Sequence, residues 1–234
     1  PIPSRGLGDV YKRQDYYDAI NFYGSGFWKN SAVDTPARIL VENGHEQTFA
    51  YRFDWDELRE VNGVDLSRLV GAAHALEILF VMGTFDNFII KSFLFGRGSF
   101  RPALELSSNI QSYWAEFAYT GNPGKGTNNA LPLWKKWSNE GEKYLILDST
   151  LDKGIKMSDE EYTVEFLLDR LSKDSRLSDV EKCETLFGIS YDDGSGVSEN
   201  VFNNFLGGIC KGLDYDKTIE IINAVRTRLT IEDQ

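Results

Sequence analysis

The 234-residue chain contains only two histidines, two cysteines and two methionines. Because His45 and His74 are the only imidazoles, any reaction that needs a histidine base has two candidates. Cys183 and Cys210 form no C-x-x-C pair, which argues against a zinc site or a thioredoxin-type redox site. The two cysteines could form one disulfide, and the sequence leaves that pairing open.

Long apolar runs and nucleotide-binding glycine motifs are also missing. The most apolar stretch, residues 69–85, is interrupted by His74 and Glu77, so it falls short of the roughly 18 uncharged apolar residues that a membrane span needs. No glycine pair belongs to a dinucleotide or P-loop motif, and the acidic turn at 192–196 lacks the ligand spacing of a calcium loop. The sequence therefore predicts no membrane span, no cofactor and no metal.

Acidic residues outnumber basic ones, with 36 Asp and Glu against 25 Lys and Arg and a formal net charge of −11. Such a charge repels phosphate backbones, so we expect no nucleic-acid partner. The hydrophobic content of 41% and the aromatic content of 13% are those of a folded chain. The length suits one large domain or two small ones.

The chain divides into three parts by its sequence patterns. Residues 1–14 have no apolar periodicity and begin at Pro1, and we interpret them as a non-native, adapter-derived segment, with a native flexible arm as the alternative. Residues 15–155 mix helical and strand patterns and predict an α/β part. Residues 156–234 predict an acidic tail of short helices, which need tertiary contacts to be stable.

The α/β part is expected to combine helices with two strands. Apolar residues at helical spacing predict two helices over 15–44 and one helix from Ser108 that closes at Gly121. Runs of β-branched, aromatic and aliphatic residues predict a mostly buried strand at 48–53 and a short strand at 144–147 near a sheet edge.

Two further segments lie between these elements. Residues 61–73 are expected to form a loop, whereas the apolar run at 76–81 is too continuous for its period to separate a strand from a buried helix. In the tail, capping residues and helical spacing predict four helices. Three of them start at Ser158, Ser178 and Ser198, and the fourth lies over 219–229.

The segment 71–83 carries the best candidate for chemistry. His74 follows three small residues and precedes the apolar run, so a general base could project from this junction. Taken alone, such a histidine is more often structural than catalytic. His45 lies in a polar turn beside Glu46, where we expect a solvated surface role.

Four blocks, in this order, resemble the C-terminal part of type-B carboxylesterases, the cholinesterase-like branch of the α/β-hydrolases. They are residues 49–54, 71–83, 113–123 and 133–134 with the strand that follows. The resemblance covers roughly residues 36–148, is looser before them and is poor in the tail. It implies the C-terminal part of an α/β-hydrolase sheet with flanking helices, followed by the acidic helical tail, and a small carboxylic ester as the substrate.

The resemblance also implies that His74 is the triad histidine, which comes last in the chain order Ser, acid, His. No G-x-S-x-G elbow occurs in the 234 residues, so the nucleophilic Ser and the acidic Glu are expected upstream of this sequence. The chain alone is then expected to hydrolyse no ester. Glu77 matches the family's acidic position after the histidine, and we interpret it as a partner that fixes the loop or as a surface carboxylate.

Three points are left for the structure to test. The triad role requires His74 to lie near the surface, and an imidazole sealed in the core would contradict it. The acids after the first strand, Asp54, Asp56 and Glu57, are interpreted as an exposed turn. The alternatives to an esterase are a noncatalytic cholinesterase-like binding or adhesion domain, and a tail over 157–234 that acts as an interaction module.

Overall fold

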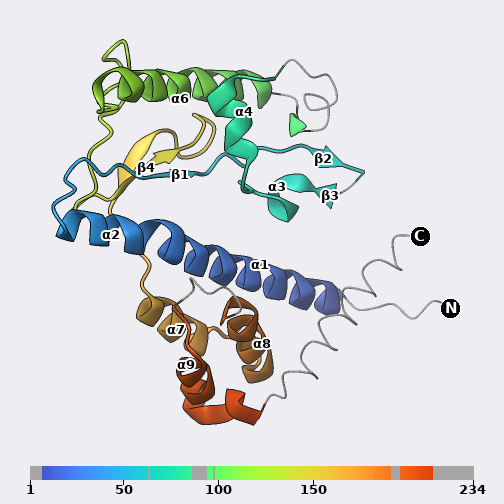
Figure 1. Ribbon diagram of the computed structural model, residues 1–234. Coiled ribbons are helices and arrows are strands. Elements are labelled where there is room, and N and C mark those ends of the chain that lie inside the picture. Colours follow the sequence, from blue (N-terminus) through green and yellow to red (C-terminus); the bar gives the residue numbers. More distant parts are fainter. Residues whose placement is uncertain (1–6, 63, 86–93, 97, 191–195, 213–234) are drawn as a thin grey trace. The chain divides into compact units, whose positions relative to one another are not determined.

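The computed structural model has a mixed fold of helices and sheet (Figure 1). It describes residues 7–62, 64–85, 94–96, 98–190 and 196–212, with side chains from residue 14 onward. The chain forms two compact units. The α/β unit contains Ala37–Glu160, and the helical unit joins the residues up to Pro36 to those from Glu161 onward. The domain boundary expected near residue 155 stays a prediction.

The α/β unit contains a three-stranded sheet with the order β1-β4-β5. The strands are β1 (Tyr51–Phe53), β4 (Tyr144–Leu147) and β5 (Lys156–Ser158). β1 runs parallel to β4, with Tyr51 opposite Leu145, and β5 runs antiparallel to β4. Because β1 and β4 are parallel, their carboxyl ends lie at the same edge of the sheet.

Both predicted strands form, and the structure corrects details of each. The strand at 144–147, expected at or near a sheet edge, is β4, which lies between β1 and the edge strand β5 and has all four residues buried. Its neighbour β5 was missed because the sequence Lys-Met-Ser has no strand pattern. The first strand is shorter than the expected 48–53, and β1 itself is half-buried, so the prediction of a mostly buried strand was wrong.

The other elements described between residues 35 and 120 are helices and a hairpin. They are α2 (Thr35–Glu42), β2 (Glu60–Val61), β3 (Val64–Asp65), α3 (Leu66–Leu69), α4 (Leu76–Met82) and α6 (Phe100–Thr120). The segment 61–73 is therefore not the plain loop that we expected. Asp65 caps α3, because its side chain accepts hydrogen bonds from the backbone of Ser67 and Arg68.

The structure identifies the apolar run at 76–81 as the helix α4 and lengthens the predicted helix around residue 110. α6 begins at Phe100, so Ser108 lies inside the helix and caps nothing. The predicted end is confirmed: Gly121 adopts φ 76° and its N–H donates to the carbonyl of Phe117. α6 runs along one face of the sheet, where Trp114 packs edge-on against Tyr51 of β1 (Figure 1).

Aromatic rings fill the core of the α/β unit. Phe80 of α4 is fully buried, and its ring centroid lies 5.0 Å from those of Phe53 and Trp55 and 5.2 Å from that of Phe85. Such edge-to-face and tilted pairs add to the free energy gained by burying their area. The core therefore ties α4 to the end of β1.

In the helical unit, α1 (Leu7–Lys29) packs against the tail helices. α1 continues through a π-helical turn, Asn30–Asp34, into α2, so the two helices predicted over 15–44 follow each other without an intervening loop. The buried side chain of Asp34 accepts hydrogen bonds from Lys29 at 2.6 Å and from the backbone N–H of Tyr162 at 2.9 Å. Tyr23 is buried and donates to Asp174 at 2.9 Å.

The tail was expected to be helical from residue 156, but its first residues form β5, and it is helical only from Val164 onward where the structure describes it. Its elements are α7 (Val164–Lys173), α8 (Asp179–Ser190), α9 (Glu199–Asn204) and a 3-10 segment, Phe205–Gly212. The caps predicted at Ser178 and Ser198 are confirmed by their hydrogen bonds to Glu181 and to the N–H of Val201. The cap at Ser158 was wrong, because Ser158 ends β5 and Thr163 caps α7. Residues 219–229 lie outside the described residues.

Cys183 and Cys210 are joined in a disulfide, a pairing that the sequence left open. Both cysteines are fully buried, and the bond connects α8 to the 3-10 segment. The two residues are 27 positions apart, so the bond closes a long loop in the unfolded chain.

Replacing both cysteines by alanine is expected to lower the free energy of unfolding of the helical unit by about 2 to 4 kcal/mol, because the cross-link restricts the unfolded chain. Urea denaturation followed by circular dichroism measures the loss. Adding reductant should lower the urea midpoint of the parent toward that of the variant and leave the midpoint of the variant unchanged. A parent midpoint that stays the same with reductant would contradict the prediction.

Candidate functional site

His74 lies on the connection between β1 and α4, in the segment after the end of α3 at Leu69 and two residues before α4 begins at Leu76. The residue is exposed, as the triad role requires. The connection leaves the sheet from the carboxyl end of β1, which is also the carboxyl end of the parallel strand β4. In α/β folds, ligand sites gather at this edge.

A tight turn holds His74. The N–H of Leu76 donates to the carbonyl of Ala73 at 3.2 Å, which places His74 and Ala75 at the two central positions. Ala75 has φ 74° and ψ −7°, a left-handed conformation. A second left-handed residue, Gly71 with φ 57°, precedes the turn.

The other end of α4 is fixed to α6 by a buried hydrogen bond. The hydroxyl of Ser107 donates to the carbonyl of Phe80 at 2.6 Å. α4 ends at Gly83, which has φ 64° and lies so close to Gln111 that an added Cβ would clash with its amide. α4 is therefore held at its middle and at its C-terminal end, and His74 lies just before its first turn.

Glu77 lies in the first turn of α4 and is half-buried. Burial raises the pKa of Tyr51, and the nearby negative charge of Glu77 raises this pKa further. Glu77 is therefore close to β1, which suits the interpretation as a residue that fixes the loop. That role stays a prediction.

His45 is exposed after α2, where its backbone carbonyl accepts a hydrogen bond from Thr48 at 2.7 Å. This position agrees with the expected surface role. Within the part of the chain that the structure describes, no group of His, Cys, Asp and Glu side chains could hold a metal ion.

The acids after β1 do not form an exposed turn, so that interpretation was wrong. Asp54, Asp56 and Glu57 are all half-buried. Asp54 forms ion pairs with Arg52 at 2.6 Å and with Lys153 at 3.3 Å. The sequence could not show these partners, because Lys153 follows the distant strand β4.

Asp148, which directly follows β4, belongs to the same group of acids. Its side chain is almost fully buried and accepts hydrogen bonds from the N–H groups of Ser149 at 2.7 Å and Lys153 at 3.3 Å. Burial raises the pKa of Asp148 from 3.8 to about 6 despite these hydrogen bonds. The hydroxyl of Ser149 donates to Glu57, so this network joins the loop after β1 to the loop after β4.

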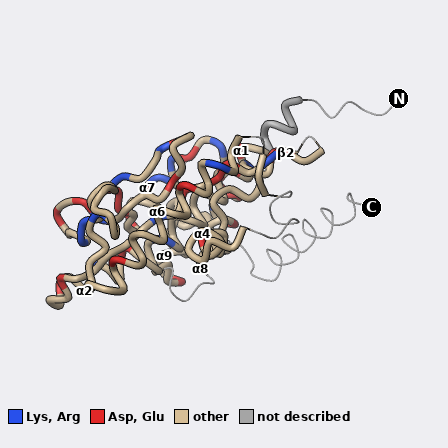
Figure 2. The backbone as a smooth tube through the Cα atoms, turned by 90° about the horizontal axis from the view of Figure 1, so that it is seen from above, with Lys and Arg blue, Asp and Glu red and all other residues tan. Residues whose placement is uncertain are grey.

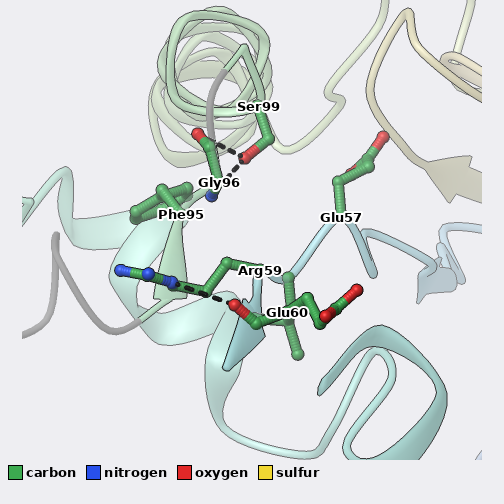
Figure 3. Close-up of a pocket in the computed structure, with 7 residues that line it drawn as sticks. Glu57, Arg59, Glu60, Phe95, Gly96 and Ser99 are labelled. Atoms are coloured by element: carbon green, nitrogen blue, oxygen red, sulfur yellow. Dashed lines mark hydrogen bonds between the residues drawn. The ribbon is translucent and has the colours of Figure 1, made fainter. Parts of the chain in front are cut away.

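A cavity of about 580 Å³ lies beside the β2 strand (Figure 3). Glu57, Leu58, Arg59, Glu60, Phe95, Gly96 and Ser99 line it. The Ser99 hydroxyl is bonded to the backbone of Gly96, and Arg59 donates to the carbonyl of Glu60. Neither His74 nor Glu77 lines this cavity, so it does not contain the predicted site.

The charges of the chain are mixed along the backbone. Figure 2 shows segments with Lys and Arg and segments with Asp and Glu scattered along the described backbone. Within the described ranges, no helix combines the length and the apolar character that crossing a membrane requires.

Comparison with known proteins points to one family. The model of the carboxylesterase family matches residues 9–166. Carboxylesterase 5A of Canis lupus familiaris is 39% identical over 103 residues, which cover 44% of this chain and 16% of that protein. Carboxylesterase 4A of Bos taurus is 38% identical over 94 residues, or 40% of this chain and 15% of that protein.

A bacterial relative is similar at a lower identity. The para-nitrobenzyl esterase of Bacillus subtilis is 30% identical over 127 residues, which cover 53% of this chain and 22% of that protein. The chain therefore spans between 15% and 22% of the length of these relatives. No solved structure matches the chain significantly.

Asp148 should make stability depend on pH. The pKa of Asp148 is higher in the folded protein than its ordinary value, so the folded state holds the proton more tightly. Its contribution to the free energy of unfolding therefore falls as the pH rises from about 4 to about 6, and the penalty is complete above this window. We expect the difference in stability between Asp148→Asn and the parent to shift in favour of the variant across this range.

Urea titrations between pH 4 and pH 7 measure this difference. Asp152→Asn, at an exposed acid in the same loop, is the matched control and should show no such trend. If the difference in stability between Asp148→Asn and the parent stays constant from pH 4 to pH 7, the acid is already ionised at pH 4. A difference that shifts in favour of the parent would also contradict the prediction.

Ser107→Ala should loosen α4, because the buried carbonyl of Phe80 loses its side-chain donor. The expected loss in the free energy of unfolding is about 1 to 2 kcal/mol. Ser108→Ala, at the exposed neighbouring residue, should change stability by less than about 0.5 kcal/mol. Equal effects of the two substitutions in thermal unfolding would argue against the anchoring role of Ser107.

Proposed function

Because the chain belongs to the carboxylesterase family, we propose that it is part of a serine hydrolase of carboxylic esters and contributes the triad histidine, His74. The observation that carries this proposal is the exposed position of His74 on the connection from the carboxyl end of β1 to α4. The family match covers this whole segment. The substrate class is a small carboxylic ester.

The nucleophile and the acid would come from sequence upstream of this chain. No G-x-S-x-G motif occurs in the 234 residues, and the chain spans only 15% to 22% of the relatives that it matches. In an α/β-hydrolase the Ser and the acid both precede the histidine. The described sheet would then be the C-terminal part of a larger α/β-hydrolase sheet.

His74 would act twice on protons during the reaction. One ring nitrogen accepts the proton of the serine hydroxyl as the serine oxygen attacks the ester carbonyl, and the same nitrogen donates it to the leaving alcohol, which forms the acyl-enzyme. His74 then takes a proton from water as the water attacks, and returns it to serine when the acid product leaves. The upstream Glu would accept a hydrogen bond from the other ring nitrogen.

Glu77 would support this chemistry without taking part in the proton transfers. Glu77 is half-buried in the first turn of α4, and its negative charge adds to the effect of burial in raising the pKa of Tyr51 in β1. In this position it would hold the start of α4, and so the loop that carries His74, against the sheet.

Reading the locus upstream of Asp15 from the source DNA is the first test. A G-x-S-x-G elbow followed by a Glu in the same frame would support the esterase. A Gly or Ala in place of the elbow Ser would favour the alternative, a noncatalytic cholinesterase-like binding or adhesion domain.

In the complete protein, His74→Ala should lower kcat for p-nitrophenyl butyrate by at least about 1,000-fold, because the serine loses its base. His45→Ala, at the other and exposed histidine, is the matched control and should leave kcat unchanged. The 234-residue chain alone should show no turnover. Turnover by this chain that persists in His74→Ala would contradict the assigned role.

A further inference from the structure

We propose that the left-handed conformation of Ala75 positions His74, so that Ala75 is a positioning residue for the candidate base. The part of this proposal that concerns catalysis rests on the proposed function. The part that concerns the orientation of the imidazole rests only on the turn from Ala73 to Leu76.

The backbone identifies the type of this turn. The hydrogen bond from Leu76 N–H to Ala73 carbonyl closes four residues, with His74 second and Ala75 third. The angles of Ala75, φ 74° and ψ −7°, match the third position of a type II turn, near 80° and 0°. A type I′ turn would also need a positive φ at His74, and His74 has none.

Alanine is an unfavourable residue at this position. A type II turn favours glycine there, because a Cβ atom crowds the backbone when φ is positive. Among the described residues that are not glycine, four have a positive φ, and two of them, Asn62 and Asn129, are of the type that tolerates it. Ala75 and Leu206 are the other two. The strain at Ala75 therefore lies directly beside the candidate base.

Strain of this kind persists only where the surrounding structure imposes it. On one side of the turn, the N–H of Ile78 donates to the carbonyl of Ala75 at 3.3 Å and begins α4, whose position is set by the buried Phe80 and its bond to Ser107. The turn is thus held from the side of α4.

The turn type determines how the His74 ring is presented. Rotation of the peptide between His74 and Ala75 would convert the turn to type I, relieve φ at Ala75 and change ψ of His74 from about 120° to about −30°. The preferred side-chain rotamers depend on these angles, so the balance of imidazole orientations at His74 would change. The type II turn therefore favours one set of rotamers for the base.

The 234-residue chain allows a test that needs no esterase activity. With only two histidines, the imidazole signals of His74 and His45 can be separated by nuclear magnetic resonance. Ala75→Val, which disfavours a positive φ more strongly than alanine, should shift the signal of His74 and leave that of His45 in place. Ala72→Val, at an exposed residue outside the turn, is the matched control and should move neither.

Ala75→Gly keeps the test decisive if the valine variant fails to fold. Glycine accepts the positive φ without strain, so the melting temperature should rise by about 2 to 4 °C. Ala72→Gly adds the same flexibility where φ is not positive, and it should lower the melting temperature or leave it unchanged. If the melting temperature of Ala75→Gly does not rise, Ala75 is not strained in the parent, and the proposal fails.

In the complete protein, Ala75→Val should lower kcat for p-nitrophenyl butyrate at least tenfold and leave KM within about twofold, because substrate binding does not depend on the histidine ring. Unchanged kcat together with an unchanged His74 signal would overturn the positioning role. If the complete parent protein hydrolyses no ester, the proposed function fails, while the resonance shifts of His74 still decide whether Ala75 orients it.

Discussion

The burial of Phe80 is the constraint on which the candidate site depends. Its ring packs against Phe53 at the end of β1 and against Trp55, and its carbonyl is bound by Ser107 of α6. These contacts fix a helix of only seven residues, which would not be stable without them. Only Ala75 separates α4 from His74. The contacts of Phe80 that fix α4 therefore also restrict where the candidate base lies.

The carboxyl ends of β1 and β4 carry a second set of constraints. Parallel pairing brings Asp54 and Asp148 to the same edge of the sheet, where Asp54 forms ion pairs and backbone donors offset only part of the cost of burying Asp148. The bond from Ser149 to Glu57 closes the two loops against each other. The connection that carries His74 therefore leaves the sheet from an edge whose loops are tied together.

Local signals in the sequence predicted several features correctly. Gly121 ends α6 because glycine accepts a left-handed φ, and Ser178 with Glu181 caps α8 because their side chains satisfy free backbone groups. The apolar run at 144–147 forms a strand. The surface position of His74 also agrees with the sequence, because small residues precede it and an apolar run follows it. Each of these depends on neighbours within a few positions.

Only the tertiary structure decided the features that depend on distant residues. The run at 76–81 became a helix because Phe80 packs against Phe53 and Trp55 and its carbonyl is bound by Ser107 of α6. β4 became the central strand because the polar β5 pairs with it. The Cys183–Cys210 bond required the approach of α8 and the 3-10 segment. The positive φ of Ala75 contradicts its local preference, because the anchored helix after it leaves the turn no other conformation.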